Sequence, residues 1–400
     1  MEKTSRIIII LLIVGMMVFL LAGSFLAQAP IKIGVVGPLT GAAAFYGDMV
    51  KGGATMYADK INAEGGINGR MIQLVFGDDM GDPREATGVA HLFSADRDIC
   101  VVVGGYHSSN TFAAQPIYRL AKMPHITPGN THWEIGWRSE WTFRNIFHDE
   151  FHIGQLADFL IYVLDLQSIA IIYDLVDPTT AHMETVKRHF EAYGRDVVAI
   201  HGYPVGTTDF VPVLLDIKGK NPEAIFAASY YAEAGLIAKQ ARDLGMDQLI
   251  VGGEALMTDS YIEIAGRASE GTVSAAPFLF DPETSPPEVI AWGEEFQQRW
   301  GIAPHWLAAN TYDAMGIAIK AIMEVGPDRS AIRDYLADLT SLDKAFVGIT
   351  GPNYFDSLGD SAKPNVFVVV EDGKFRIHPL AEGWEPPPLP REGIVWPPRD

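Results

Sequence analysis

The chain has 400 residues, 48% of them hydrophobic, and carries 30 basic and 50 acidic side chains. Its formal net charge of −20 excludes binding that depends on neutralising phosphates, so we expect no nucleic acid partner. A chain of this length exceeds what one hydrophobic core usually serves, and it therefore predicts two domains.

The N-terminus has the pattern of a secretory signal. Lys3 and Arg6 precede an apolar run over residues 7–21, and small residues follow it. We therefore expect a signal peptide over residues 1–29 and a periplasmic or other extracytoplasmic location. An uncleaved membrane anchor is the weaker alternative, because the run is short of the about 20 residues that span a bilayer.

Strand and helix patterns alternate in the first part of the chain. Strands are predicted at 31–36, 71–76, 99–103 and 124–127, and helices at 47–63, 83–94 and 111–121. This alternation indicates βαβ units around a parallel sheet. Asp82 before Pro83 is typical of a helix start, so we interpret Asp78, Asp79 and Asp82 as turn and capping residues and expect no metal site.

A second alternating series begins near Asp149. Its predicted strands are 168–173, 197–201, 224–228, 248–252 and 271–276, and its helices are 149–164, 180–193, 209–218 and 232–244. Two doubly wound α/β lobes are therefore expected. After His378 the chain becomes rich in proline, which predicts an extended tail over residues 381–400, either a passive extension or a partner-recognition segment.

Polar residues follow two neighbouring strands of the first series. Gly104 to Ser109 (GGYHSS) follow one strand, and Thr127 to Thr131 (TPGNT) follow the next. Ligands bind at the carboxyl ends of such strands, and hydroxyls, free N–H groups and a helix N-terminus together favour a carboxylate. The alternative is structural: Ser108 or Ser109 caps the helix at 111–121, and Thr131 caps the segment around Trp133.

These segments carry a family resemblance, together with Ile31 to Gly41 (IKIGVVGPLTG), Tyr57 to Gly69 (YADKINAEGGING), the acidic stretch at residues 78–83 and residues 208–218. Over about residues 31–380 the chain resembles the type I periplasmic solute-binding proteins of ABC transporters, specifically the branched-chain (leucine, isoleucine, valine) amino acid class. The resemblance implies a monomer without cofactor, metal or catalytic residues. Such a protein binds a branched-chain or related amino acid by lobe closure and delivers it to permease subunits.

The resemblance also implies how the lobes are assembled. Helices at 287–300 and 311–325 rejoin the first lobe, and strands at 365–370 and 374–377 rejoin the second. Lobe 1 is then 30–148 plus 278–354, and lobe 2 is 149–277 plus 355–380. The chain crosses a three-stranded hinge between them.

The resemblance assigns the ligand-binding residues. Ser108 gives its hydroxyl and N–H to the ligand carboxylate. Thr131 gives its N–H to the carboxylate and its hydroxyl to the ammonium group, which also meets the Gly129 carbonyl. From the second lobe, Glu254 binds the ammonium and Tyr230 stands at the family spacing from it.

Tyr46 matches an aromatic wall residue of the family, and Trp306 is a second candidate. Relatives often carry a cysteine pair where this chain has Gly81 and His107, and a covering ring where it has Pro178. The single Cys100 predicts no internal disulfide.

His107 lies beside the predicted carboxylate cradle and favours a wider choice of ligand. Three alternatives to an importer's amino acid-binding protein stay open. The ligand is a short-chain amide or an aromatic or aliphatic carboxylic acid; the chain is a ligand-sensing ectodomain; or it is an amidase-like enzyme. The sequence has no Gly-x-Ser-x-Gly elbow and no evident base for Ser108, so we expect no enzyme.

Overall fold

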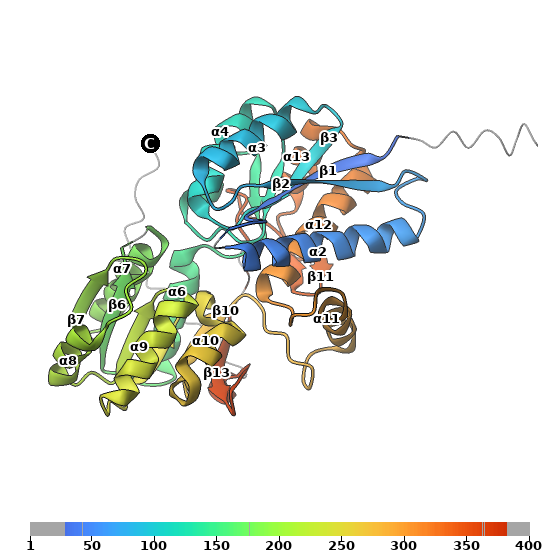
Figure 1. Cartoon of the computed structure of the whole chain (residues 1–400). Coiled ribbons are helices and arrows are strands. Elements are labelled where there is room, and N and C mark those ends of the chain that lie inside the picture. Colours follow the sequence, from blue (N-terminus) through green and yellow to red (C-terminus); the bar gives the residue numbers. More distant parts are fainter. Residues whose placement is uncertain (1–28, 42, 176, 362, 364, 382–400) are drawn as a thin grey trace, which may run out of the picture.

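The computed structural model describes residues 29–381, apart from positions 42, 176, 362 and 364. It contains two lobes, each built on its own large sheet (Figure 1). The predicted signal peptide and proline-rich tail lie outside the described residues, except at their inner ends. Within the described residues, no helix is long and apolar enough to cross a membrane.

The first lobe has a five-stranded parallel sheet in the order β2-β1-β3-β4-β5. Its strands are β1 (Ile31–Gly37), β2 (Ile72–Asp78), β3 (Ile99–Gly104), β4 (His125–Thr127) and β5 (Thr142–Arg144). Its helices are α2 (Ala44–Ala63), α3 (Pro83–Ala95), α4 (Ser108–Leu120), α5 (Glu134–Arg138), α11 (Pro287–Trp300), α12 (Trp306–Val325) and α13 (Arg329–Asp338). Every residue of β3 is buried, Cys100 included, as an unbroken apolar strand predicts.

The second lobe has a seven-stranded sheet in the order β14-β13-β10-β9-β8-β6-β7. The parallel strands are β6 (Ser168–Asp174), β7 (Asp196–Tyr203), β8 (Ala224–Ala228), β9 (Leu249–Gly252) and β10 (Val273–Ala276); β13 (Val366–Glu371) and β14 (Lys374–Ile377) pair antiparallel. The helices are α6 (Asp149–Tyr162), α7 (Asp177–Ala192), α8 (Val211–Lys220), α9 (Tyr231–Asp243) and α10 (Asp259–Ala265). Short 3-10 helices are η1 (Glu254–Leu256), η2 (Gly266–Ser269) and η3 (Pro379–Ala381).

The chain passes between the lobes three times, after β5, after β10 and after the small ribbon of β11 (Phe346–Gly348) and β12 (Gly351–Asn353). The returning helix α12 packs along α2, and its side chains belong to the core of the first lobe. The predicted architecture of two doubly wound lobes with a triple hinge is therefore confirmed. The exact residues at which one lobe ends and the other begins stay a prediction. Phe355, predicted as the first residue of the returning part of lobe 2, contacts Phe143 of lobe 1, which favours a third crossing after residue 355.

Several helix starts differ from the predictions. Helix α4 begins at Ser108, after His107, so neither Ser108 nor Ser109 caps a helix at 111–121. Helix α12 begins five residues before the predicted start because the His305 imidazole accepts from the N–H of Leu307. The prediction for α3 is confirmed, since the Asp82 carboxylate accepts from the N–H of Arg84 at 2.7 Å.

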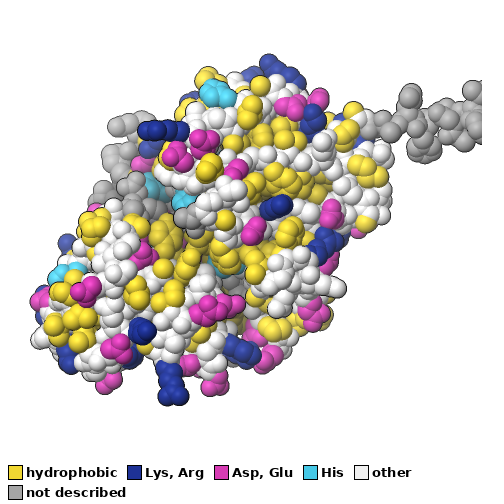
Figure 2. Space-filling model, viewed as in Figure 1, with side chains coloured by type: hydrophobic (Ala, Val, Ile, Leu, Met, Phe, Trp, Pro, Cys, Tyr) yellow, Lys and Arg dark blue, Asp and Glu magenta, His cyan; other side chains and the backbone are white. Residues whose placement is uncertain are grey.

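Acidic and basic side chains are interspersed over both lobes on the face shown in Figure 2. Among the described residues visible there, basic groups form no continuous patch.

Candidate ligand-binding site

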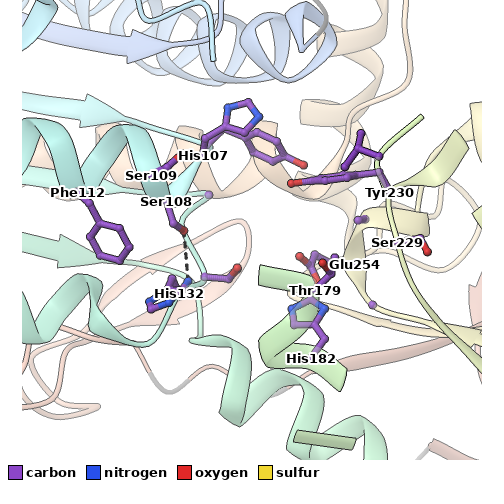
Figure 3. Close-up of a pocket in the computed structure, with 16 residues that line it drawn as sticks. His107, Ser108, Ser109, Phe112, His132, Thr179, His182, Ser229, Tyr230 and Glu254 are labelled. Atoms are coloured by element: carbon purple, nitrogen blue, oxygen red, sulfur yellow. Dashed lines mark hydrogen bonds between the residues drawn. The ribbon is translucent and has the colours of Figure 1, made fainter. Parts of the chain in front are cut away.

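A cavity of about 380 Å³ lies between the two lobes, within the size range of small-molecule sites (Figure 3). The first lobe supplies Tyr106, His107, Ser108, Ser109, Phe112, Gly129, Thr131 and His132, and the second supplies Thr179, His182, Val205, Ser229, Tyr230, Gly253, Glu254 and Ala255. Six of the seven predicted site residues are in this lining; Tyr46 is not. The structure thus brings together predicted site residues that are up to 147 positions apart in the sequence, from His107 to Glu254.

The first-lobe wall starts from a sharp turn at the end of β3. Gly104 and Gly105 have φ values of 122° and 106°, which side chains rarely tolerate. A Cβ on Gly104 would lie 2.1 Å from the carbonyl oxygen of Val36 in β1. This turn directs the chain to the N-terminus of α4, where Ser108 faces the cavity.

Two buried polar side chains hold this wall in place. Asn130 donates to the Tyr106 carbonyl at 2.9 Å and accepts from the Thr111 hydroxyl at 2.7 Å, so it ties the two cradle loops together. Arg144 donates to the carbonyls of Asn130 at 3.1 Å and His132 at 2.7 Å, and its guanidinium forms a 2.7 Å ion pair with Asp360. The sequence analysis missed this bracing because Asp360 is distant in the chain.

The three predicted cradle residues, Ser108, Gly129 and Thr131, line the same cavity. Ser108 accepts from the N–H of His132 at 3.4 Å, which joins the loops again. Thr131 does not cap the segment around Trp133, because α5 begins there without a side-chain hydrogen bond at its N-cap. The Thr131 side chain instead helps to lower the pKa of the neighbouring Asp149. A threonine hydroxyl has lone pairs that can accept from a ligand ammonium. Gly129 lines the same cavity.

The second-lobe wall comes from the ends of β8 and β9. Tyr230 precedes α9 and Glu254 begins η1. Tyr231, in contrast, packs against the cores of both lobes, as expected if only one of the adjacent tyrosines faces the cavity. Trp306 supports the wall from behind, donating through Nε1 to the Glu254 carbonyl at 3.4 Å.

Two histidines that the sequence analysis did not single out pair with acids in this wall. His152 Nε2 lies 2.8 Å from a Glu254 carboxylate oxygen, and His182 Nε2 lies 2.8 Å from a carboxylate oxygen of Asp149. Burial alone would raise the pKa of each acid, but the facing imidazoles outweigh it and lower the pKa of both. Burial likewise opposes the charged form of His182, yet Asp149 raises the pKa of this imidazole.

The aromatic wall differs from the prediction. Tyr106 lines the cavity, and Tyr46 stacks behind it with ring centroids 3.9 Å apart and planes 15° apart. Tyr46 therefore reaches the cavity only through Tyr106. The side chain of Pro178 is outside the described residues, and its neighbour Thr179 faces the cavity instead.

His107 lies at the rim of the cradle, beside the turn at Asp79 to Gly81. A Cβ on Gly81 would lie 3.2 Å from the His107 ring, so the two positions that carry cysteines in relatives are adjacent here. Burial lowers the pKa of His107, and the charge of Asp79 only partly offsets this shift. His107 is therefore a neutral donor or acceptor at neutral pH.

Residues 30–373 match a family model described as periplasmic binding protein. A leucine-, isoleucine-, valine-, threonine- and alanine-binding protein of Pseudomonas aeruginosa is 30% identical over 362 residues, covering 90% of this chain and 93% of the relative.

Solved structures agree with this match. A leucine-binding protein of Thermotoga maritima has a TM-score of 0.78 at 26% identity, covering 87% of this chain and 97% of that one. A branched-chain amino acid transporter substrate-binding protein of Streptococcus pneumoniae, solved with isoleucine, has a TM-score of 0.79 at 27% identity, covering 86% and 97%. The chain therefore belongs to the periplasmic binding protein family, whose members include the substrate-binding proteins of branched-chain amino acid ABC transporters.

Proposed function

We propose that this protein captures a branched-chain or related amino acid between its lobes and delivers it to the permease of an ABC importer. The observation that carries the proposal is the shared cavity: Ser108, Gly129 and Thr131 of one lobe face the same space as Tyr230 and Glu254 of the other. The names of the relatives point to the same class of ligand.

The arrangement explains how binding closes the lobes. A carboxylate held by the first lobe and an ammonium held by the second make one ligand bridge both, so binding stabilises the closed state over the open one. Charge-assisted contacts contribute about 1.5–3 kcal/mol each, and four or five of them support affinity of about −8 kcal/mol, in the micromolar range, after the costs of immobilisation and closure.

The proposal includes a monomer that is exported by the signal peptide and acts outside the cytoplasm. It includes no catalytic step, because the hydroxyl of Ser108 faces a backbone N–H of His132 rather than a general base. Solute uptake distinguishes import from a sensing role. Vesicles that contain the purified transporter should take up the solute only when this protein is present.

Calorimetry with a panel of amino acids, amides and small carboxylic acids tests the ligand class. We expect leucine, isoleucine or valine to bind with micromolar affinity. If no compound carrying a carboxylate binds, the proposed function fails. Turnover of a bound amide or ester would instead identify the chain as an enzyme.

A further inference from the structure

A second cavity, of about 400 Å³, lies at the hinge and shares no lining residue with the interlobe cavity. Its walls come from the second and third crossings of the chain and from the adjoining part of the first lobe. They are mostly apolar, with Phe278, Leu342, Ile349, Pro352, Tyr354 and Val366 among the lining residues. The proposed function does not use this hinge cavity.

The hinge cavity contains a buried cation. Of the described residues that line it, Lys363 is the charged one, and it is only 5% exposed. Its amine donates to the hydroxyl of Thr350, which lines the same cavity. Within the described residues, no carboxylate forms an ion pair with this amine. A lysine amine has three hydrogens to donate, so one hydroxyl leaves most of its capacity unused.

The acid that acts on Lys363 electrostatically is Asp313 of α12, and Asp313 does not line the cavity. Its carboxylate accepts from the N–H groups of Ile349 and Thr350, at 2.9 Å each, and from the Thr350 hydroxyl. The ribbon covers this carboxylate so closely that Gly348 has no room for a Cβ. Thr350 therefore stands between acid and amine, and the positive end of this chain of contacts is the end at the cavity.

The Lys363 amine keeps its charge at neutral pH. Burial lowers its pKa to about 8, and the charge of Asp313 offsets part of this shift. A buried ammonium without an adjacent carboxylate has lost hydration that a single hydroxyl does not replace. An anionic group in the cavity would supply the missing counter-charge, and the apolar walls would bury a hydrocarbon tail attached to it.

We propose that the hinge cavity is a second ligand site, which binds a small organic anion with an apolar tail. The anionic group pairs with the amine of Lys363, and the tail lies against Phe278, Leu342 and Ile349. This site is independent of the proposed function, because a solute in the interlobe cavity and an anion at the hinge occupy separate walls.

Calorimetry with hexane-1-sulfonate, in the presence of excess L-leucine, tests the proposal. The sulfonate stays anionic at every pH of interest, and leucine occupies the interlobe cavity. We expect the wild-type protein to bind the sulfonate and to bind 1-hexanol, which lacks the charge, at least about tenfold more weakly. Lys363→Met should weaken the sulfonate by about tenfold to a hundredfold, the range of one charge-assisted contact.

A second variant keeps the test valid if Lys363→Met does not fold. Leu342 lines the cavity but is 66% exposed, so Leu342→Glu adds a negative charge there without disturbing the core, and it should also weaken the sulfonate. The matched control is Lys344→Met. Lys344 is an exposed lysine outside the lining, paired with Asp338 at 2.7 Å, and its loss should leave sulfonate binding unchanged.

Two results would overturn the hinge site: wild type that does not bind hexane-1-sulfonate, or binding that is the same in Leu342→Glu and in folded Lys363→Met as in wild type. Titration with L-leucine alone judges the proposed function separately. If leucine does not bind, the proposed function fails, while the dependence of sulfonate binding on Lys363 and Leu342 still decides the hinge site.

Discussion

The two walls of the cavity are built from different chemistry. The first lobe offers hydroxyls, backbone groups and a helix N-terminus, braced by Asn130 and Arg144. The second lobe offers ionisable pairs, His152 with Glu254 and His182 with Asp149. We infer that the neutral dipoles of the first lobe bind the carboxylate of any ligand, whereas the acids of the second lobe distinguish ligands by the α substituent. The first lobe therefore contributes affinity that all carboxylate ligands share, and the second lobe contributes the preference among them.

The largest expected effect is on the brace of the first lobe. Arg144→Ala should lower the free energy of unfolding by about 3–5 kcal/mol, because it leaves Asp360 buried without its cation and three carbonyl and carboxylate contacts unmade. Denaturant unfolding measures this. Arg138→Ala, which breaks an exposed pair with Glu134, should cost less than about 1 kcal/mol. Equal costs for the two variants would refute the bracing role.

The next largest effect is a change in affinity that should differ between leucine and its hydroxy analogue, which differ only in the group that faces the second lobe. Glu254→Gln should weaken leucine by about tenfold to a hundredfold, since the ammonium loses its anionic partner. The hydroxy analogue of leucine, 2-hydroxy-4-methylpentanoate, should keep its affinity, because its uncharged hydroxyl can donate to the amide oxygen that replaces the carboxylate. Calorimetry with both ligands measures the split. Glu233→Gln, an acid of the same lobe outside the cavity lining, is the control. Equal losses for both ligands would contradict the division between lobes.

A smaller effect is expected from the first lobe. Ser108→Ala removes one hydroxyl from the carboxylate cradle and should weaken leucine and its hydroxy analogue by the same factor, up to about tenfold. Competition binding with the two ligands is the measurement. A factor that differs between them would show that the first lobe also reads the α substituent.

The smallest expected effect is a pH dependence of the second lobe. The pKa of His182 is raised by Asp149 above 6.5, so its stabilisation is complete below that pH and is lost as pH rises through the folded pKa. The pKa of Asp149 is lowered below 3.8, so its contribution is lost only as pH falls through that lower value. The stability difference between wild type and His182→Gln should therefore be greatest between these limits and shrink above neutrality. A difference that grows with rising pH would refute the ion pair.

Much of the fold was predictable because its signals are local. The apolar run at 99–103 predicts strand β3, and Asp82 before Pro83 predicts the start of helix α3. The meeting of Ser108, Gly129 and Thr131 at one cavity was predictable for the same reason, since they follow two neighbouring strands. Tyr46 was misplaced because sequence correspondence does not show that Tyr106 stands in front of it.

The histidine pairs were not predictable from local pattern. His152 and Glu254 are 102 positions apart, and they meet only through the packing of α6 against the end of β9. His152 lies on a helix that is buried nearly all round, so no amphipathic pattern marks it. Its Nδ1 lies 2.8 Å from the side-chain oxygen of Asn365, which the third hinge crossing brings back to the second lobe.

A crystal structure of the protein with bound L-leucine tests the central claim most directly. The account predicts leucine in the interlobe cavity, with its carboxylate on Ser108 and Thr131 and its ammonium towards Glu254. Leucine bound elsewhere, or bound to one lobe alone, would contradict it.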